Sequence, residues 1–264
     1  DSLNLIQTPI LFTDLKSAEL IKYASNAFLA MKISFINQMA DLCESLNTDI
    51  HFISRGMGLD KRIGDKFLHP GPGYGGSCFP KDTIALSKIA SDNNVDLSII
   101  NNVISYNKNR KKSLIKKINH ILGNDIKDMS VAVLGLSFKP GTDDMRESPS
   151  LDLIPSLVEN VKEIKVYDPI AMDEASKYIK DVYFADNIED CIKNVDVTII
   201  LTEWSEFRTL SAQYLSKFVK GNIVIDFRNA LNPENFINKN ITLHQVGRGP
   251  FNLSLIHISE PTRP

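Results

Sequence analysis

The sequence has 264 residues, more than one average domain holds, so two compact units are expected. Hydrophobic residues make up 43% and charged residues 23% of the chain, a balance typical of globular domains with substantial cores. The formal net charge of −2 gives no electrostatic argument for nucleic-acid or membrane binding. No apolar run approaches the roughly 20 residues of a membrane span, so neither kind of partner is expected.

Three cysteines, Cys43, Cys78 and Cys191, lie far apart in the chain. Their spacing fits neither a disulfide framework nor a metal site, so no bound metal is expected. The first residues lack the basic, apolar and small-residue order of a secretory signal. A reducing cytoplasm is therefore the predicted location.

Residues 17–122 are predicted to form an all-helical domain. Over residues 17–47 apolar side chains recur every three or four positions in two stripes, which predicts one long helix buried on much of its circumference. Such a helix needs more partners than one domain usually supplies, so we expect it at a dimer interface. Shorter helical patterns follow at residues 49–59, 81–94 and 97–122.

A glycine-rich loop, residues 69–77, leads directly to Cys78. Its glycines let the backbone approach a ligand closely. Pro80 suits the first turn of a helix, so Cys78 is expected just before a helix amino end, where the helix dipole and Lys81 both favour the thiolate. Most lone cysteines are small buried hydrophobic residues, which remains the interpretation of the other two. Cys78 is instead predicted to be a nucleophile.

A nucleophilic thiolate requires partners. Lys22 and Asn26 are four residues apart on one face of the long helix, where they interrupt an otherwise apolar surface. One interpretation is a lysine that reaches solvent and an asparagine satisfied in the core. The other is a cation and an amide aimed at a developing oxyanion. Spacing alone leaves both open.

Residues 129–250 are predicted to form a Rossmann-like domain with a parallel sheet, which makes the expected fold class α/β. Short β-rich runs alternate with helical stretches, as right-handed crossovers between parallel strands require. The runs are residues 130–138, 163–168, 196–202, 222–227 and 241–247. Ligands bind beyond the carboxyl ends of such strands, so a second site is expected around the turns after Leu136, Asp168, Leu201 and Asp226. Gly135 is only a weak nucleotide signal, because no complete Gly-x-Gly-x-x-Gly pattern follows the strand.

Five motifs occur in the order in which one enzyme family carries them. They are AELIKYASNAFLAMKISFIN, GPGYGGSCFPKD, VLGLSFKPGTDDMRESPS, TEWSEF and DFRN. Together they resemble the UDP-glucose/GDP-mannose dehydrogenase family over residues 9–249. The resemblance implies four-electron oxidation of the C6 alcohol of a nucleotide sugar to a carboxylate, with two NAD⁺. The GGSCFPKD segment favours UDP-glucose, which gives UDP-glucuronate, over N-acetylmannosamine sugars, and less firmly over GDP-mannose or another nucleotide sugar.

The resemblance also implies catalytic roles. Cys78 would attack the intermediate aldehyde to give a thiohemiacetal, and loss of a second hydride would leave a thioester for water to hydrolyse. Lys22 and Asn26 would stabilise the oxyanions. Asp82 would act with a water or with Lys22 in proton transfer; the alternative for Asp82 is a plain charge at a helix amino end.

Binding roles follow from the same resemblance. The substrate-binding residues would be Phe67, Leu68, His69, Pro70, Gly71, Gly75, Lys139 and Arg228, with Arg62 reaching the substrate of a neighbouring subunit in a homodimer or larger oligomer. Lys81 and Arg146 would contact NAD. Lysine and arginine in loops at strand ends suit phosphate recognition, although by pattern alone each is more often a solvated charge.

The family's amino-terminal dinucleotide-binding domain has no counterpart in residues 1–16. We therefore expect these residues to be a remnant or linker, and the chain to be a fragment without activity of its own. The main alternative is a nucleotide-sugar-binding module that performs no redox chemistry. A cysteine hydrolase is disfavoured, because nothing orients His69 as a base. Residues 254–264 are expected to be a non-native tail, with a native disordered tail as the alternative.

Overall fold

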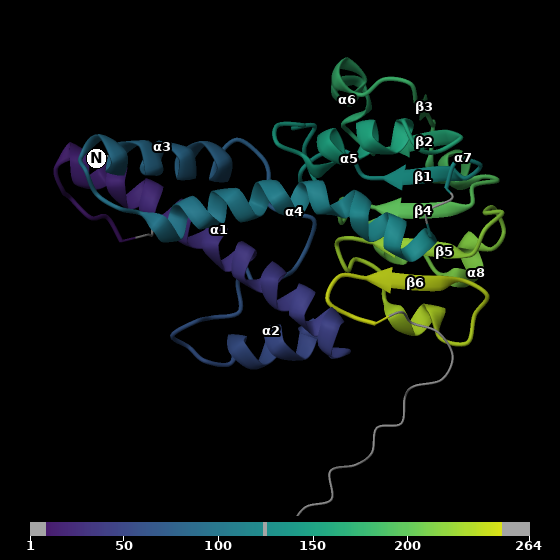
Figure 1. Cartoon of the computed structure of the whole chain (residues 1–264), viewed down its shortest axis with the longest axis horizontal. Helices are drawn as coiled ribbons and strands as arrows, with labels where there is room; N and C mark the ends of the chain where they lie inside the picture. The colour runs from purple at the N-terminus through teal and green to yellow at the C-terminus, as the bar shows by residue number, and fades with distance from the viewer. Residues whose placement is uncertain (1–8, 124–125, 250–264) are drawn as a thin grey trace, which may run out of the picture.

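The computed structural model describes residues 9–123 and 126–249 (Figure 1). Helices occupy the chain up to Leu122, and a six-stranded parallel sheet with its covering helices follows, which confirms the predicted α/β class. The tail expected at 254–264 and the first half of the remnant expected at 1–16 lie outside the described residues. No described helix is both long and apolar enough to cross a bilayer.

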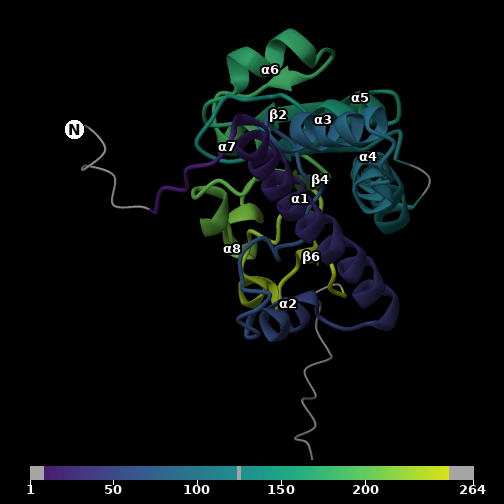
Figure 2. The same cartoon turned by 90° about the vertical axis from the view of Figure 1, so that its left-hand side faces the viewer.

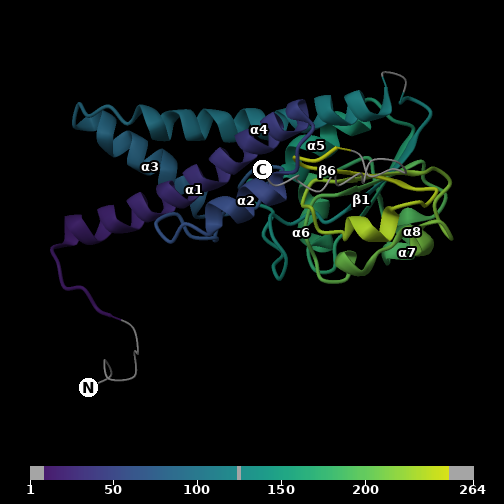
Figure 3. The same ribbon diagram turned by 90° about the horizontal axis from the view of Figure 1, so that it is seen from below.

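The helical part consists of four helices, of which the first and last are long. They are α1 (Leu15–Leu46), α2 (Ile50–Gly58), α3 (Phe79–Asp92) and α4 (Ser98–Leu122). Asp14 caps α1 by accepting a hydrogen bond from the Ser17 amide, and Asn47 ends it in the left-handed conformation with φ 54°. Helix α1 contacts α2, α3 and α4, and the helical part projects from one side of the sheet (Figure 3).

The prediction that α1 is buried on much of its circumference is wrong within this one chain. The buried face carries Ala27, Ala30, Ile36, Ala40 and Cys43. Large apolar residues elsewhere on the helix are each between 44% and 56% exposed, namely Leu20, Ile21, Phe28, Phe35 and Leu42. The physical reason is that the neighbouring helices of the described chain cover only part of its surface. A dimer interface on this exposed surface stays a prediction.

The sheet has the strand order β3-β2-β1-β4-β5-β6, and every neighbouring pair is parallel. Its strands are β1 (Ser130–Leu134), β2 (Glu163–Tyr167), β3 (Tyr183–Phe184), β4 (Val197–Ile200), β5 (Ile223–Asp226) and β6 (Thr242–Gln245). The order reverses at β1, as in doubly wound α/β folds. Each predicted β-rich run contains one strand. Strand β3 was not predicted, because a strand of two residues is too short to show any periodicity.

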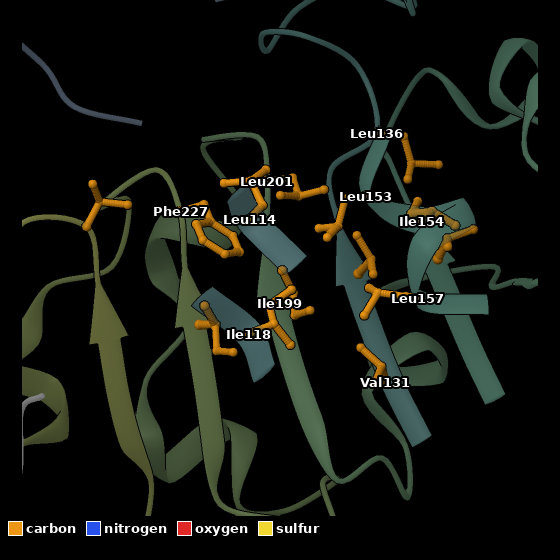
Figure 4. Close-up of a cluster of buried hydrophobic side chains, with 14 of the residues drawn as sticks. Leu114, Ile118, Val131, Leu136, Leu153, Ile154, Leu157, Ile199, Leu201 and Phe227 are labelled. Carbon is orange, nitrogen blue, oxygen red and sulfur yellow. The ribbon is translucent and has the colours of Figure 1, made fainter. Parts of the chain in front are cut away.

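Short helices cover the two faces of the sheet. They are α5 (Pro149–Val158), α6 (Met172–Tyr178), α7 (Ile188–Ile192), α8 (Ala212–Leu215), η2 (Phe207–Thr209) and η3 (Pro233–Phe236). One core joins α4 and α5 to the sheet: Leu114 and Ile118 of α4 lie with Leu153 of α5 over Ile199 and Phe227 (Figure 4). Helix α4 therefore begins in the helical part and ends packed on the sheet. The predicted domain limits stay predictions.

A second junction ties α1 and α2 to the end of the sheet. The Ile50 amide donates to Gly247 O over 2.9 Å, and the Gly247 amide donates to Glu44 Oε1 over 2.7 Å. Gly247 has φ +71°, and a Cβ there would lie 2.5 Å from the Ile50 side chain. Arg248 pairs with Asp49 at 2.6 Å. Figure 2 shows α2 next to β6, so the helical part is held to the sheet at two places.

Candidate active site

Cys78 lies immediately before α3 and is exposed, whereas the other two cysteines are buried. Pro80 occupies the first turn of α3, as the sequence predicts. The thiol is therefore accessible and meets the partial positive charge of a helix amino end. Cys191 is the opposite case, since burial raises the pKa of its thiol to about 12. Of the three cysteines, Cys78 has the surroundings of a reactive thiol.

Asn26 of α1 and Asp82 of α3 contact each other at the first turn of α3, which Cys78 precedes. Asn26 Nδ2 donates to Asp82 Oδ2 over 2.6 Å, and Lys81 Nζ lies 2.9 Å from Asp82 Oδ1. The Asp82 side chain is 0% exposed. Burial alone would raise the pKa of Asp82. Hydrogen bonds from Lys81 and Asn26, with the charges of Lys81 and Lys22, outweigh burial and lower that pKa. Asp82 is therefore an ionised carboxylate at neutral pH.

Lys22 reaches solvent, as one of the two interpretations left open by its spacing predicted. The apolar surface around it is open in this chain, with Ile21 49% exposed, so Lys22 is exposed as well. Its charge nevertheless contributes to the lowered pKa of Asp82, which puts its ammonium within electrostatic range of α3. The predicted group of Lys22, Asn26 and Asp82 thus comes together from two helices.

Two exposed cations flank Cys78. Lys81 comes from the same helix turn, and Arg146 comes from the loop after β1, where Asp144 holds its guanidinium by bonds of 2.9 and 2.8 Å. Hydrogen bonding to Asp144 is the main cause that raises the pKa of Arg146, and Cys78 also contributes, so the sulfur and the guanidinium are electrostatic neighbours. The Lys81 and Arg146 side chains are 65% and 68% exposed. Such a donor pair fits an anionic, phosphate-bearing ligand.

Polar side chains of α1 and α4 hold the glycine-rich loop. Asn37 Oδ1 accepts the Gly71 amide at 2.7 Å, and Arg110 Nε donates to Gly71 O at 3.2 Å. Asn107 binds both backbone groups of Tyr74, with distances of 2.8 Å to N and 3.0 Å to O. None of Asn37, Asn107 and Arg110 was predicted from the sequence as a site residue. The only available signal was polar residues at helix positions whose neighbours are apolar.

Two glycines bring this loop against the α/β part. The Gly76 amide donates to Arg146 O over 2.8 Å. A Cβ on Gly75 would lie 2.4 Å from Glu147 O, and one on Gly76, which has φ +80°, would lie 2.6 Å from the Phe138 ring. Only glycine permits this approach. The cysteine loop and the loop after β1 therefore form one surface.

Arg228 borders the same surface from the end of β5. A Cβ on Gly71 would lie 3.5 Å from its Nη1. Its guanidinium donates to Leu201 O over 2.8 Å and to Phe138 O over 2.7 Å, and lies 3.1 Å from Glu203. Arg228 thus braces the ends of β4 and β5 against the loop after β1.

The remaining predicted binding residues are more scattered. Lys139 Nζ lies 5.4 Å from the centre of the Phe138 ring, so it belongs to this surface. The Phe67 and Phe79 rings are 6.0 Å apart, next to the cysteine. Leu68 and Pro70 are buried and His69 is exposed. Arg62 is 89% exposed, and its hydrogen-bond partner among the described residues is Asp60.

The second site expected around the turns after Leu136, Asp168, Leu201 and Asp226 stays a prediction, and part of these turns is held by hydrogen bonds within the protein. Asp168 Oδ2 accepts hydrogen bonds from the Leu136 amide at 2.7 Å and from Trp204 Nε1 at 3.1 Å. Gly135 has φ +92°, and a Cβ there would lie 2.5 Å from Thr202. Lys139 and Arg228, from the turns after β1 and β5, border the glycine-rich loop.

Two further observations concern other kinds of site. Within residues 9–123 and 126–249, no three His, Cys, Asp or Glu side chains gather as metal ligands do. A cavity of about 250 Å³ between α4 and α5 is lined by Lys111, Lys112, Ile115, Asp152, Leu153 and Ser156. None of these is a predicted site residue.

Sequence comparison places this geometry among known enzymes. Residues 16–109 match the central-domain model of the UDP-glucose/GDP-mannose dehydrogenase family, and residues 132–233 match its UDP binding domain. A UDP-glucose 6-dehydrogenase of Rickettsia conorii is 45% identical over 89% of this chain and 55% of its own length. The enzyme YwqF of Bacillus subtilis, of the same name, is 42% identical over 92% of this chain and 55% of its own. The chain thus spans about half the length of these relatives.

Solved structures agree with this result. A UDP-glucose dehydrogenase from Pyrobaculum islandicum superposes with a TM-score of 0.80 at 32% identity, over 93% of this chain and 54% of that one. A UDP-D-ManNAc dehydrogenase from Pyrococcus horikoshii gives 0.75 at 25% identity, over 92% and 55%. Enzymes named for different sugars share this fold, so the fold alone does not select the sugar. Since the models of two consecutive domains match in order and the fold follows, the chain belongs to the UDP-glucose/GDP-mannose dehydrogenase family.

Proposed function

We propose that this chain supplies the reactive thiol and the UDP-sugar-binding part of an NAD-dependent dehydrogenase that oxidises UDP-glucose to UDP-glucuronate. The observation that carries the proposal is the exposed Cys78 at the amino end of α3, flanked by Lys81 and Arg146. The names of the relatives support the choice of UDP-glucose. The activity and substrate of the whole protein remain part of this proposal.

Cys78 provides the nucleophile of the second oxidation. After the C6 alcohol has lost a hydride and a proton, Cys78 Sγ adds to the aldehyde carbon and forms the C–S bond of a thiohemiacetal. Loss of a second hydride and proton gives a thioester. Water then adds to the same carbon, the C–S bond breaks, and the carboxylate and the free thiol are released. NAD⁺, when bound, takes up the hydride of each oxidation, two per sugar.

Lys22 and Asn26 stabilise the negative charge that develops on the C6 oxygen. An asparagine amide has two N–H donors, and one of them is bound to Asp82. The second N–H stays available for the oxyanion, in an orientation that Asp82 fixes. Lys22 adds a positive charge next to this donor. Asp82, ionised and close to Lys22, exchanges protons with that lysine or with a water.

Charged groups around the thiol provide the binding surface. The cations Lys81 and Arg146 fit the phosphates of NAD, and Lys139 and Arg228 fit the diphosphate and nucleotide sugar of the substrate. The other substrate-binding residues we propose are Phe67, Leu68, His69, Pro70, Gly71 and Gly75. Arg62, exposed and distant, reaches the substrate of a neighbouring subunit in a homodimer or larger oligomer. The predicted cytoplasmic location accords with free, unpaired cysteines.

The test is the stoichiometry of the reaction in the whole protein that carries this sequence. Incubation with UDP-glucose and NAD⁺ should give two NADH and one UDP-glucuronate per sugar consumed. GDP-mannose and UDP-N-acetylmannosamine at the same concentration provide the matched comparison. A single NADH per sugar, or faster turnover of either other sugar, contradicts the proposal.

A second candidate is a nucleotide-sugar-binding module without redox chemistry. The observation in its favour is that the UDP binding domain matches over residues 132–233, while the chain spans about half of each relative. It predicts that UDP binds in a calorimetric titration and that no NADH forms in the whole protein.

A further inference from the structure

Lys111 of α4 is a buried cation that none of the roles above uses. It follows Arg110 and precedes Lys112, in a run of basic residues, yet its side chain is only 4% exposed. Its Nζ donates to Glu147 O and to Glu147 Oε2, both over 2.8 Å. An ammonium group is expensive to bury unless its partners compensate. Both of its partner atoms belong to one residue at the edge of the candidate site.

Glu147 has an unusual backbone. Its φ of 53° lies in the left-handed region, which glutamate seldom adopts. The carbonyl that binds Lys111 also lies against the glycine-rich loop, 2.4 Å from where a Cβ on Gly75 would be. A cation that binds this carbonyl stabilises the peptide in its strained conformation. The Lys111 contact therefore acts on the backbone and not only on the carboxylate.

The peptide before Glu147 belongs to Arg146. Arg146 O accepts the Gly76 amide over 2.8 Å, two residues before Cys78. The Arg146 guanidinium is an electrostatic neighbour of that thiol. Asp144 holds the guanidinium itself, and the conformation at Glu147 sets where the backbone of this loop lies against the cysteine loop. Lys111 is linked to Cys78 by its hydrogen bond to Glu147, the covalent bond from Glu147 to Arg146, the hydrogen bond from Gly76 to Arg146 O, and the chain from Gly76 to Cys78.

The same face of α4 holds the other side of the site. Asn107, one turn before Lys111, binds both backbone groups of Tyr74, and Arg110 binds Gly71 O. One helix therefore anchors the cysteine loop through Asn107 and the loop after β1 through Lys111. Because α4 is a rigid element packed on the sheet, it fixes the two loops relative to each other.

We propose that Lys111 is a positioning residue that locks the Glu147 peptide in the left-handed conformation and so keeps the Arg146 guanidinium next to Cys78. The proposal rests on the proposed function for its significance, since it concerns the surroundings of the same thiol. Its test needs no turnover, however, because the chemical reactivity of Cys78 can be measured directly. The competing explanation is an ion pair that contributes stability alone.

The experiment compares alkylation of Cys78 by iodoacetate, an anion, with alkylation by neutral iodoacetamide in the whole protein. The rate ratio of the two reagents, followed by mass spectrometry of the Cys78 peptide, reports the positive charge near the sulfur. Lys111→Met should lower this ratio about fivefold, as displacement of one nearby charge would. The exposed neighbour Lys112→Met is the control and should keep the wild-type ratio. Arg146→Gln should lower the ratio at least as much as Lys111→Met.

A second substitution tests the backbone step. Glycine adopts a left-handed conformation without strain, so adding Glu147→Gly to Lys111→Met should restore most of the ratio. Should Lys111→Met fail to fold, Glu147→Gly and Glu147→Val in the wild-type background carry the same test. The glycine variant should keep the ratio and the valine variant, which disfavours positive φ, should lower it. Thermal unfolding of every variant is measured alongside.

Three results would overturn the proposal. The first is a Lys111→Met protein that loses thermal stability but keeps the wild-type ratio, since that is a stability role alone. The second is an equal fall of the ratio in Lys112→Met, which indicates a general effect of charge. The third is a Glu147→Val protein with an unchanged ratio. The proposed function fails separately, by the NADH count, and that count does not depend on the alkylation ratio.

Discussion

The helical part and the α/β part differ in which side chains they leave exposed to solvent. The helical part leaves large apolar side chains half uncovered, with Leu20 50% and Phe28 56% exposed, and keeps Cys78 accessible. The α/β part buries even the polar residues at its strand ends, such as Asp168 and Asp226. The helical part thus presents Cys78 and large apolar side chains on an open surface, where another surface can pack. The second part is a platform whose polar groups satisfy one another.

The platform owes its rigidity to carboxylates that bind several donors. Asp226 accepts hydrogen bonds from the Arg228 amide at 3.0 Å, the Leu231 amide at 2.9 Å and Gln245 Nε2 at 3.0 Å. These bonds fix the loop that carries Arg228. Because the buried Asp226 carboxylate binds donors on several residues, it fixes the conformation of the turn after β5 and also stabilises it. The two parts therefore predict different consequences of mutation.

The largest effect is expected for Cys78→Ser in the whole protein. A serine hydroxyl is far less acidic than a thiol, adds slowly to the aldehyde and forms an ester that is a poor acyl donor. Formation of UDP-glucuronate should fall by several orders of magnitude, while UDP binding is kept. Steady-state assays with calorimetry of UDP binding measure both. Cys43→Ser and Cys191→Ser are the controls and should affect stability at most; near-normal product from Cys78→Ser would falsify the assignment.

The second-largest effect is expected for Lys22→Ala. If Lys22 acts as an oxyanion donor, its removal should cost about 2.7–4 kcal/mol of transition-state stabilisation. This corresponds to a fall in kcat of about 10²–10³-fold, with UDP binding unchanged. Lys16→Ala, on the same exposed helix but more than a turn away, should keep its activity. Equal losses in the two variants would point to a general effect of charge on α1 instead of a role at the site.

Asp226→Ala tests the platform. It removes the acceptor of three donors, of which the Leu231 amide and Gln245 Nε2 are buried. An unsatisfied buried donor costs about 1–3 kcal/mol, so the free energy of unfolding, measured in urea, should fall by about 3 kcal/mol. The exposed Asp143→Ala is the matched control. A loss below about 0.5 kcal/mol would mean that the loop has other anchors.

Phe28→Asp tests the open surface of α1. If this surface forms a dimer, an aspartate there should weaken association by about tenfold or more, because the apolar area of Phe28 is lost and a charge must be desolvated. Sedimentation velocity at micromolar concentrations measures the shift. Ser45→Asp, exposed on the same helix, should leave association unchanged. A wild-type protein that sediments only as a monomer at tens of micromolar removes the dimer prediction.

The smallest effect concerns pH. The folded pKa of Asp82 is lowered, so its contribution to stability is complete above the unfolded pKa of about 3.9 and is lost as pH falls through the folded pKa. Between pH 7 and pH 3 the wild-type protein should therefore lose more stability than Asp82→Asn. Urea unfolding at each pH measures the difference. Parallel profiles for the two proteins would show that Asp82 has no such role.

Much of the fold could be predicted because helices and parallel strands have short-range patterns. The apolar period over residues 17–47 predicted α1, and the alternation of β-rich and helical runs predicted the parallel sheet. The position of Cys78 just before a helix could be predicted from Pro80 and from the glycines that precede the cysteine in the chain. In each case the residues that determine the structure are close in sequence.

Tertiary structure alone decided which surfaces are covered and which side chains meet. Asn107 and Lys111 look like ordinary helix residues until α4 packs on the sheet and brings them to Tyr74 and Glu147, more than thirty residues away. The open surface of α1 and the hydrogen bonds of Asp168 beside β1 depend in the same way on what packs against them. The physical reason is that hydrophobic periodicity records only that a face is apolar, whereas burial and hydrogen-bond partners are set by elements distant in the chain.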